Sequence, residues 1–221
     1  MNSFINNLDF FIFMKHYNYW ALKLTGILVL IFIVQLMFDG FTELFVLDSS
    51  RVLVRPWTMI TSVFLHGGLT HIMFNGFALA LFGSITENII GSKRFLWLFL
   101  IGGIIANIPG VFFYNSSLGA SGAIFSVLGV LILLRPTMTV WLNFMPVPMW
   151  LAGIIWAIQD ILGIFIPDGV GNFAHLGGLA FGLIYGHSLR RAFLTRRSKK
   201  HGDRILTDEE IEDWENRMFG I

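Results

Sequence analysis

The strongest constraint on this chain is the recurrence of apolar stretches long enough to cross a lipid bilayer. The chain is 55% hydrophobic and only 13% charged, with a mean hydropathy of +0.71. That composition is typical of a polytopic membrane protein and excludes a soluble globular domain. A spanning helix needs about 20 mostly apolar residues. We predict six spans, at Leu22–Phe38, Leu69–Ile90, Phe95–Phe113, Ala120–Leu134, Met149–Ile166 and Phe173–Phe193.

These spans predict an all-α membrane protein, because a helix satisfies its backbone hydrogen bonds within the bilayer. We divide the chain into a short N-terminal segment (1–20), a six-helix core (21–193) and a tail (194–221) that is first basic and then acidic. A capping box at Thr207–Glu210 predicts a short helix in that tail. The long first loop, Asp39 to Gly68, is rich in aromatic and apolar residues, so we expect it to be partly embedded in the membrane.

The orientation of the spans follows from where the cations fall, since cytoplasmic loops carry an excess of Lys and Arg. With six spans, both termini share a side, and the other side holds only Arg51 and Arg55. The terminal side holds Lys15, Lys23, Lys93, Arg94, Arg135, Arg190, Arg191, Arg196, Arg197, Lys199, Lys200, Arg204 and Arg217. We therefore place both termini in the cytoplasm and the long loop outside. The N-terminus lacks the pattern of a cleaved signal peptide, and we expect a bacterial inner membrane.

Few polar side chains fall inside the predicted spans, where ionisable groups are costly and usually functional or paired. Three of them, His71, Ser121 and His175, each lie in the first residues of a span predicted to run inward. They should therefore lie at similar depth near the outer face of the membrane. We also single out Asn75, Glu87 and Asp160 within the spans.

Ser121 stands in the sequence Gly119-Ala120-Ser121-Gly122, at the start of the fourth predicted span. The first turn of a helix offers free N–H groups and the positive end of the helix dipole, which suit a nucleophile whose product oxyanion must be held. A Gly/Ser patch for helix packing is the alternative interpretation, and it is common in membrane proteins.

Two histidines could complete a site around this serine. His71 and Asn75 are four residues apart, so they share a helix face and could donate hydrogen bonds to a developing negative charge, or instead cross-link helices. His175 precedes a small-residue face formed by Gly178 and Gly182. If that face packs on Gly122 and Ser126, His175 comes within reach of Ser121 as its general base. A packing or proton-relay role is the alternative for His175.

Other chemistries lack their residues. There is no cysteine, so thiolate metal sites and cysteine nucleophiles are excluded, and no His-Glu-x-x-His motif of a zinc protease occurs. Asp160 is the only aspartate well inside a span, so a two-aspartate protease lacks its second acid. We interpret Asp160 as a polar contact near the outer end of the fifth span or part of a water path. We expect no metal, cofactor or nucleic acid, because topology explains the basic tail.

Three motifs occur in one order across the six spans: His66-x4-His71-x3-Asn75, Gly119-Ala-Ser121-Gly122 and Ala174-His175-x2-Gly178-x3-Gly182. Together they resemble the rhomboid intramembrane serine proteases, over about Leu22 to Phe193. The resemblance implies a six-helix bundle with a membrane-embedded first loop around Trp57. It implies Ser121 as the nucleophile and His175 as its base in a dyad without an aspartate. It also implies an oxyanion hole made by His71, Asn75 and the Ser121 N–H, with Glu87 holding helices together.

Two residues depart from the family pattern. Thr58 stands where the family often has Arg after the loop tryptophan, which affects a stabilising loop contact and not the chemistry. Phe125 stands where the family often has Tyr against the catalytic histidine, and Phe keeps the stacking surface. We thus expect an intramembrane serine endopeptidase that cleaves transmembrane helices of membrane proteins near the outer face of the bilayer. The alternatives are a catalytically silent rhomboid-like protein that binds membrane helices and, with less support, a small transporter.

Overall fold

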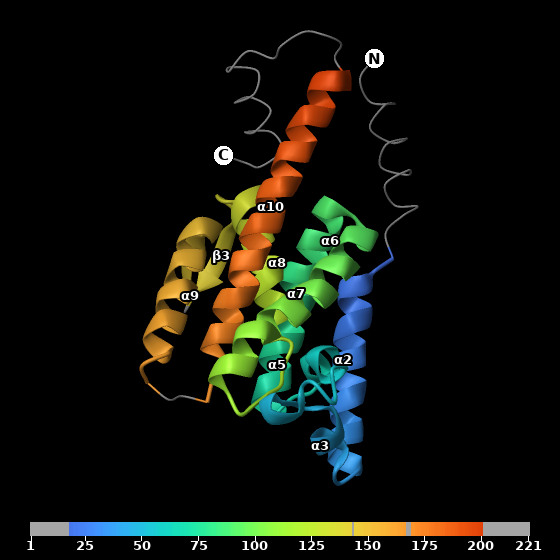
Figure 1. The fold of residues 1–221 in the computed structure, drawn as a ribbon. Helices are drawn as coiled ribbons and strands as arrows, with labels where there is room; N and C mark the ends of the chain where they lie inside the picture. The colour runs from blue at the N-terminus through green and yellow to red at the C-terminus, as the bar shows by residue number, and fades with distance from the viewer. Residues whose placement is uncertain (1–17, 143, 167–168, 201–221) are drawn as a thin grey trace.

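The computed structural model describes residues 18–142, 144–166 and 169–200, with residues 193–200 described by their backbone only. The predicted N-terminal segment up to residue 17 and the predicted tail helix at Thr207–Glu210 lie outside the described residues. The long helices form a bundle in which the start of the first and the end of the last lie at the same end (Figure 1). They are α2 (Trp20–Met37), α5 (Leu69–Ala78), α6 (Ser84–Ile90), α7 (Ser92–Phe113), α8 (Ser121–Leu134), α9 (Met149–Gly163) and α10 (Asn172–Lys200).

Among the described residues, three helices are long and apolar enough to cross a membrane. They are α2, α7 and the continuous helix Leu69–Ile90, in which the π-helical turn η3 (Leu79–Gly83) joins α5 to α6. Helices α8 and α9 are apolar but have only 14 and 15 residues. At a rise of 1.5 Å per residue, 14 residues reach about 21 Å, which is less than the bilayer core of about 30 Å. The count of six spans therefore stays a prediction.

The ends of two helices differ from the predicted spans. Helix α9 ends at Gly163 and not at Ile166, as expected ahead of Pro167, because proline disfavours the helical conformation of the residue before it. Helix α10 does not end at Phe193 but continues to Lys200. Residues 194–200 include no Gly or Pro, and basic residues are favourable at a helix C-terminus, so the helix continues where its apolar character stops.

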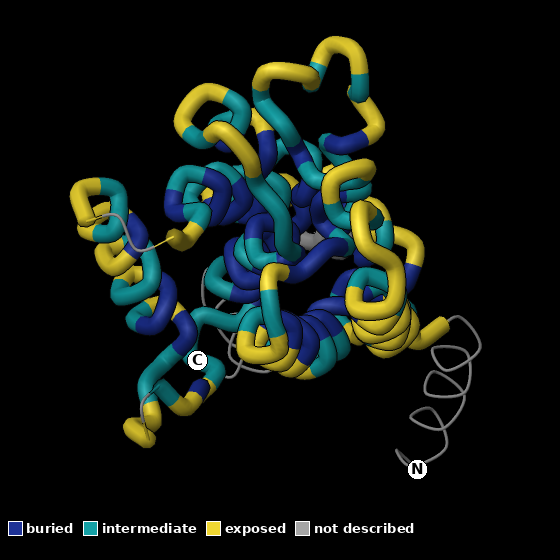
Figure 2. The backbone as a smooth tube through the Cα atoms, turned by 90° about the horizontal axis from the view of Figure 1, so that it is seen from below, coloured by how far each residue is buried: buried dark blue, intermediate teal, exposed yellow. Residues whose placement is uncertain are grey.

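The short helix α8 occupies the centre of the bundle. Ten of its 14 residues are buried, and it packs closely against α10 and α7. Figure 2 shows the buried backbone gathered in the middle of the molecule and the exposed positions around its rim. Because α8 is enclosed by other helices, its ends need not reach the water layers on their own. Its first residue, Ser121, can thus be held inside the protein and below its rim.

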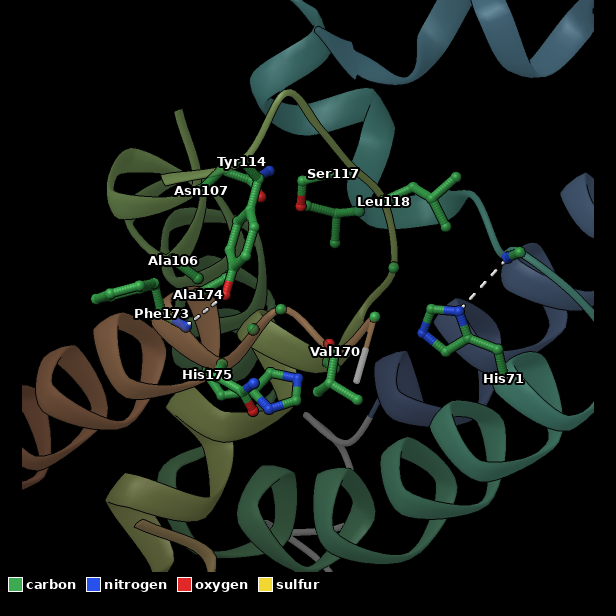
Figure 3. Close-up of a pocket in the computed structure, with 18 of the residues that line it drawn as sticks. His71, Ala106, Asn107, Tyr114, Ser117, Leu118, Val170, Phe173, Ala174 and His175 are labelled. Carbon is green, nitrogen blue, oxygen red and sulfur yellow. Dashed lines mark hydrogen bonds between the residues drawn. The ribbon is translucent and has the colours of Figure 1, made fainter. Parts of the chain in front are cut away.

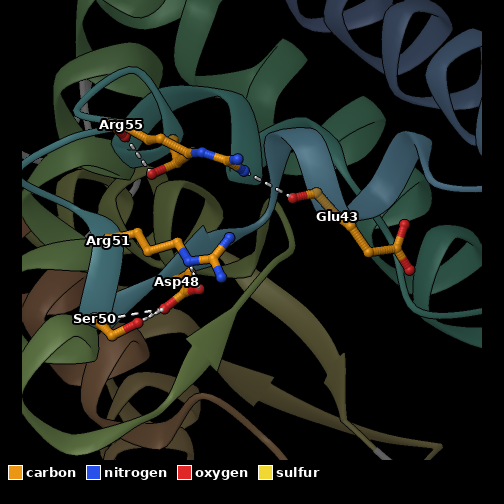
Figure 4. Close-up of polar contacts among 6 residues, drawn as sticks. Glu43, Asp48, Ser50, Arg51 and Arg55 are labelled. Carbon is orange, nitrogen blue, oxygen red and sulfur yellow. Dashed lines mark hydrogen bonds and ion pairs between the residues drawn. The ribbon is translucent and has the colours of Figure 1, made fainter.

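The long first loop folds into short pieces: α3 (Phe41–Phe45), β1 (Leu47–Asp48), a 3-10 turn η1 (Ser49–Arg51), α4 (Thr58–Thr61) and a second turn η2 (Ser62–Phe64). Polar contacts stabilise the exposed side of this loop (Figure 4). Asp48 accepts hydrogen bonds from Ser50 and forms an ion pair with Arg51, with 3.4 Å between Oδ2 and Nε. These hydrogen bonds from Ser50 hold the pKa of Asp48 below its usual value, aided by the nearby arginines. Arg55 reaches the carbonyl of Glu43 in the same region.

Two small antiparallel sheets, which the sequence did not predict, accompany the helices of this mostly helical chain. Strand β1 pairs with β2 (Ser116–Ser117), and β3 (Thr139–Leu142) pairs with β4 (Met145–Pro148) as a hairpin between α8 and α9. The first pairing has the greater consequence. It ties the first loop to the segment that leads directly into Ser121, two elements far apart in sequence, which no local pattern predicts.

Glu87 joins three helices at the end of the bundle where α2 begins. Its side chain, fully buried, accepts hydrogen bonds from the backbone N–H groups of Trp20 and Ala21 and from the hydroxyl of Ser92. The first N–H groups of a helix lack partners within it, and a carboxylate is favourable at that positive end. Glu87 therefore stabilises the start of α2 against α6 and α7.

Candidate active site

A cavity of about 940 Å³ lies at the end of the bundle where α5, α8 and α10 begin. All four residues predicted for the dyad and the oxyanion hole line it, His71, Asn75, Ser121 and His175, together with the predicted supporting residues Gly119 and Gly122. Figure 3 shows His71 and His175 as part of its wall, with Tyr114 and Asn107 nearby. Glu87 and Trp57 lie elsewhere, at the start of α2 and at the start of α4 respectively.

Ser121 is the first residue of α8, so its backbone N–H belongs to the first turn, whose donors have no partner inside the helix. The segment before Ser121 is held in place by hydrogen bonds to the first loop. The N–H of Gly119 donates to the carbonyl of Ser62 at 2.9 Å, and strand β2 pairs with β1 just before it. Gly119 has a φ of +124°, a conformation that favours glycine. The chain can thereby turn sharply into the helix that carries the serine.

His71 and Asn75 extend from one face of α5. The ring Nδ1 of His71 accepts a hydrogen bond of 3.4 Å from the N–H of Gly67. A neutral ring that accepts at Nδ1 carries its proton on Nε2, and that nitrogen lies beside Gly119 and so near Ser121. Asn75 is buried and donates one amide hydrogen to the carbonyl of His71. The Asn75 side chain also lines the cavity.

His66, a neighbour of His71 that the family motif includes, is buried at the end of the first loop. Its ring lies edge-on to that of His71, with centroids 5.0 Å apart. Burial, followed by the nearby charge of His71, lowers the pKa of His66 to about 4. His66 is therefore uncharged at neutral pH and packs as a neutral ring behind His71.

The backbone and ring of His175 are both held by aromatic residues. Phe173, two residues earlier, donates its N–H to the hydroxyl of Tyr114 at 3.1 Å. The ring of Phe125 from α8 stacks on His175 with centroids 4.3 Å apart and planes within 8° of parallel. Sequence reasoning did not find Tyr114, because its contact depends on how α10 approaches the end of α7.

The small-residue faces of α8 and α10 meet. A Cβ on Gly178 would collide with the carbonyl of Gly122, and one on Gly182 with the carbonyl of Ser126. Glycine permits this approach of two backbones, which larger residues would prevent. The approach brings the first turns of both helices, with Ser121 and His175, to the same cavity.

Asp160 makes a polar contact, as one of the two sequence interpretations predicted, but the sequence did not identify its partner. Its carboxylate lies 2.8 Å from Nδ1 of His175. Only 5% of Asp160 and 8% of His175 is exposed. A signal was present: an aspartate and a histidine inside apolar helices are expected to pair. Sequence spacing alone does not say which face of α9 meets α10.

Asn107 from α7 connects the first loop to the helix bundle beside the cavity. Its amide donates to the carbonyl of Met59 at 2.8 Å and to the hydroxyl of Ser62 at 3.0 Å. Ser62 in turn accepts from Gly119, so Asn107 supports the turn before Ser121 through two hydrogen bonds. It was not among the predicted site residues, since a single asparagine in an apolar span gives no indication of its partner.

Comparison with known proteins identifies relatives of this chain. The family model described as a rhomboid domain matches residues 54–192. RHOMBOID-like protein 4 of Arabidopsis thaliana is 33% identical over 147 residues, which cover 65% of this chain and 37% of the relative. The mitochondrial presenilin-associated rhomboid-like protein of Mus musculus is 35% identical over 159 residues, 64% of this chain and 40% of the relative. The putative rhomboid protease YdcA of Bacillus subtilis is 33% identical over 132 residues, 58% and 64% respectively.

The chain thus spans less than half the length of the Arabidopsis and mouse relatives. They include a plant protein and a mitochondrial one, so the comparisons do not support the bacterial inner membrane that we expected from the sequence. The comparisons support a membrane-embedded family, and the apolar helices of this chain agree with it. The match over most of the helical core places this chain in the rhomboid family.

Proposed function

We propose that this protein is an intramembrane serine endopeptidase that cleaves transmembrane helices of other membrane proteins near the outer face of the bilayer. Ser121 is the nucleophile, His175 is its general base, and His71, Asn75 and the Ser121 N–H form the oxyanion hole. The observation that carries the proposal is the convergence of these four side chains, from three helices, on one cavity.

The proposed reaction begins when Nε2 of His175 accepts the proton of the Ser121 hydroxyl as the serine oxygen attacks the scissile carbonyl. The carbonyl oxygen then gains negative charge. Donors aimed at that charge lower the barrier, and the free N–H at the start of α8 supplies one of them. His175 returns the proton to the leaving amine, which leaves an acyl-enzyme on Ser121. Water then hydrolyses the acyl-enzyme with His175 again acting as the base.

The lining of the cavity indicates how a substrate helix reaches the serine. Phe74 lines the cavity and is also 73% exposed, so the cavity extends to the outer surface of α5. At the far side, the cavity reaches Gly163 and Ile164 at the end of α9. A substrate helix would enter laterally between α5 and α9 from the bilayer and present an unwound segment to Ser121.

The decisive experiment compares purified wild-type protein with Ser121→Ala in liposomes that contain a single-span substrate. A fluorophosphonate probe reports independently on the reactivity of the serine. We expect the wild type to cleave the substrate and to be labelled, and Ser121→Ala to do neither. The mutant should keep its thermal unfolding midpoint, since the serine side chain is small and lies at the cavity wall.

Two controls make the result specific. Ser126→Ala removes another α8 hydroxyl, one that is buried and bonded within its own helix, and this variant should still be labelled. If wild type and Ser121→Ala bind the substrate equally and neither cleaves it, the protein is a silent helix-binding member of the family and the proposal fails.

A further inference from the structure

The contact between Asp160 and His175 links the two helices that border the cavity on one side. Asp160 lies in the last turn of α9, and His175 in the first turn of α10. Their Oδ1 and Nδ1 atoms are 2.8 Å apart, and both side chains are at least nine-tenths buried. A buried carboxylate without a partner is strongly unfavourable. The imidazole of His175 is therefore the group that stabilises the Asp160 carboxylate in its buried position.

This contact determines which nitrogen of His175 can act as a base. A carboxylate accepts hydrogen bonds, so Nδ1 must carry the proton and donate it to Asp160. The lone pair of the neutral ring is then on Nε2, at the opposite edge of the imidazole. Phe125 stacks against the face of the same ring. Asp160 and Phe125 thus restrict the rotation of the ring about both of its side-chain torsions.

The second carboxylate oxygen of Asp160 has no hydrogen-bond partner among the described groups. Each additional donor to a carboxylate would disperse its charge. Among the described residues, the polar contact of the Asp160 carboxylate is with His175, so its negative charge is directed at that ring. This arrangement differs from Glu87, a buried carboxylate whose two oxygens accept three hydrogen bonds from the start of α2 and from Ser92.

We propose that Asp160 is a positioning residue for His175, so that the site works as a Ser-His-Asp arrangement and not as a dyad. The inference rests on the proposed function of Ser121 and His175. Asp160 keeps the proton of His175 on Nδ1, and its charge stabilises the imidazolium that forms when Nε2 takes the proton of Ser121. Asp160 itself gains no proton in the reaction.

The test uses the full chain in liposomes with Asp160→Asn, Asp160→Glu and Glu87→Gln, measured for kcat, KM and thermal unfolding over a range of pH. Asp160→Asn keeps the shape but removes the charge and can present an amide donor to the ring. We expect it to lower kcat by about 10² to 10⁴-fold with little change in KM. Asp160→Glu retains the charge and should recover part of that loss.

The pH profile separates positioning from simple support of the fold. Asp160→Asn removes a negative charge that lies against the His175 ring, so the acidic midpoint of kcat/KM should move away from its wild-type value. Asp160→Glu should leave that midpoint near the wild-type position. The other titratable groups that line the cavity among the described residues are His71 and Tyr114, and these variants leave both in place. Glu87→Gln should lower the unfolding midpoint without moving the profile.

The outcomes distinguish this inference from the proposed function. If wild type cleaves and Asp160→Asn shows the same kcat and the same acidic midpoint, the inference is overturned while the serine mechanism stands. It is also overturned if Asp160→Asn resembles Glu87→Gln, with reduced stability and an unshifted profile. A ¹⁵N spectrum of histidine-labelled wild type, assigned with His175→Gln, needs no folded Asp160 variant. A proton on Nδ1 of His175 supports the inference, and a proton on Nε2 in the neutral ring contradicts it.

Discussion

At the scale of single residues, the site depends on one backbone conformation next to the serine. Gly119 has a positive φ, and a Cβ built on it would lie 2.8 Å from Cε1 and Nε2 of His71. The position therefore excludes any side chain for two separate reasons, backbone strain and contact with a ring that lines the cavity. Gly119 thus couples the entry into α8 to the placement of His71.

We predict that Gly119→Ala lowers stability and nearly abolishes cleavage. A left-handed conformation costs a residue with a Cβ about 1 to 2 kcal/mol, and the displaced His71 ring adds to that. A misplacement of about 1 Å can cost about 10²-fold in rate, so the loss of kcat should be at least that large. The measurement is cleavage in liposomes together with thermal unfolding in detergent.

The matched control for that substitution is Gly68→Ala. Gly68 is extended, and a Cβ on it would meet nothing within 4 Å. Its activity and unfolding midpoint should stay close to wild type. Equal effects of the two substitutions would show that the turn before Ser121 has no special requirement for glycine.

At the scale of elements, the contact of α8 with α10 positions the two halves of the site. The backbones touch at two glycines of α10, Gly178 and Gly182, and at Gly129 of α8, whose Cβ would lie 2.7 Å from the carbonyl of Leu179. Ser121 lies at the start of α8 and His175 in the first turn of α10, and both line the cavity. Any separation of the helix axes therefore changes the distance between the proposed nucleophile, Ser121, and the proposed base, His175.

We predict that Gly182→Ala destabilises the protein and reduces cleavage, although Gly182 lies two turns away from His175. Its Cβ would meet backbone atoms of Ser126, which cannot move as a flexible side chain can. Inserting a methyl group into a packed core costs typically about 1 to 3 kcal/mol. The measurement is the thermal unfolding midpoint in detergent, followed by cleavage at a temperature where the variant is folded.

Gly26→Ala supplies the control within a helix. Gly26 lies on the exposed face of α2, where an added Cβ meets nothing within 4 Å. Alanine is favoured over glycine in a helix interior by about 1 kcal/mol, so this variant should match or slightly exceed the stability of wild type. A Gly182→Ala protein as stable as Gly26→Ala would mean that the close approach of α8 and α10 is not required.

At the scale of the whole molecule, the bundle has two chemically different ends. The cavity, the first loop and the starts of α5, α8 and α10 lie at one end, and the starts of α2 and α7 lie at the other. The distribution of Lys and Arg predicts that the cavity end faces outward. The chain has no cysteine, so single introduced cysteines can report on this orientation without background.

We predict that a membrane-impermeant maleimide applied to intact cells labels Glu43→Cys and does not label Lys93→Cys. Both side chains are exposed. Helix α3, which holds Glu43, lies at the end of the bundle opposite to the start of α7, which holds Lys93. Lysing the cells should make Lys93→Cys reactive, which controls for its accessibility. Labelling of Lys93→Cys before lysis, with Glu43→Cys protected, would reverse the predicted orientation.

The sequence by itself determined most of the helical layout, because the cost of an unsatisfied backbone in lipid makes each apolar stretch a helix. It also singled out Ser121 and His175 as polar groups at equal predicted depth. Hydrophobicity could not place the end of α10, since a helix can continue in water after its apolar residues stop.

Only the tertiary structure decided the partner of His175. Asp160 and His175 are 15 residues apart, on two helices joined by a loop, and their contact depends on the rotation of α9 and α10 about their own axes. The pairing of β1 with β2 likewise joins segments almost 70 residues apart. Contacts of this kind arise from the packing of whole helices, so no local pattern of residues records them.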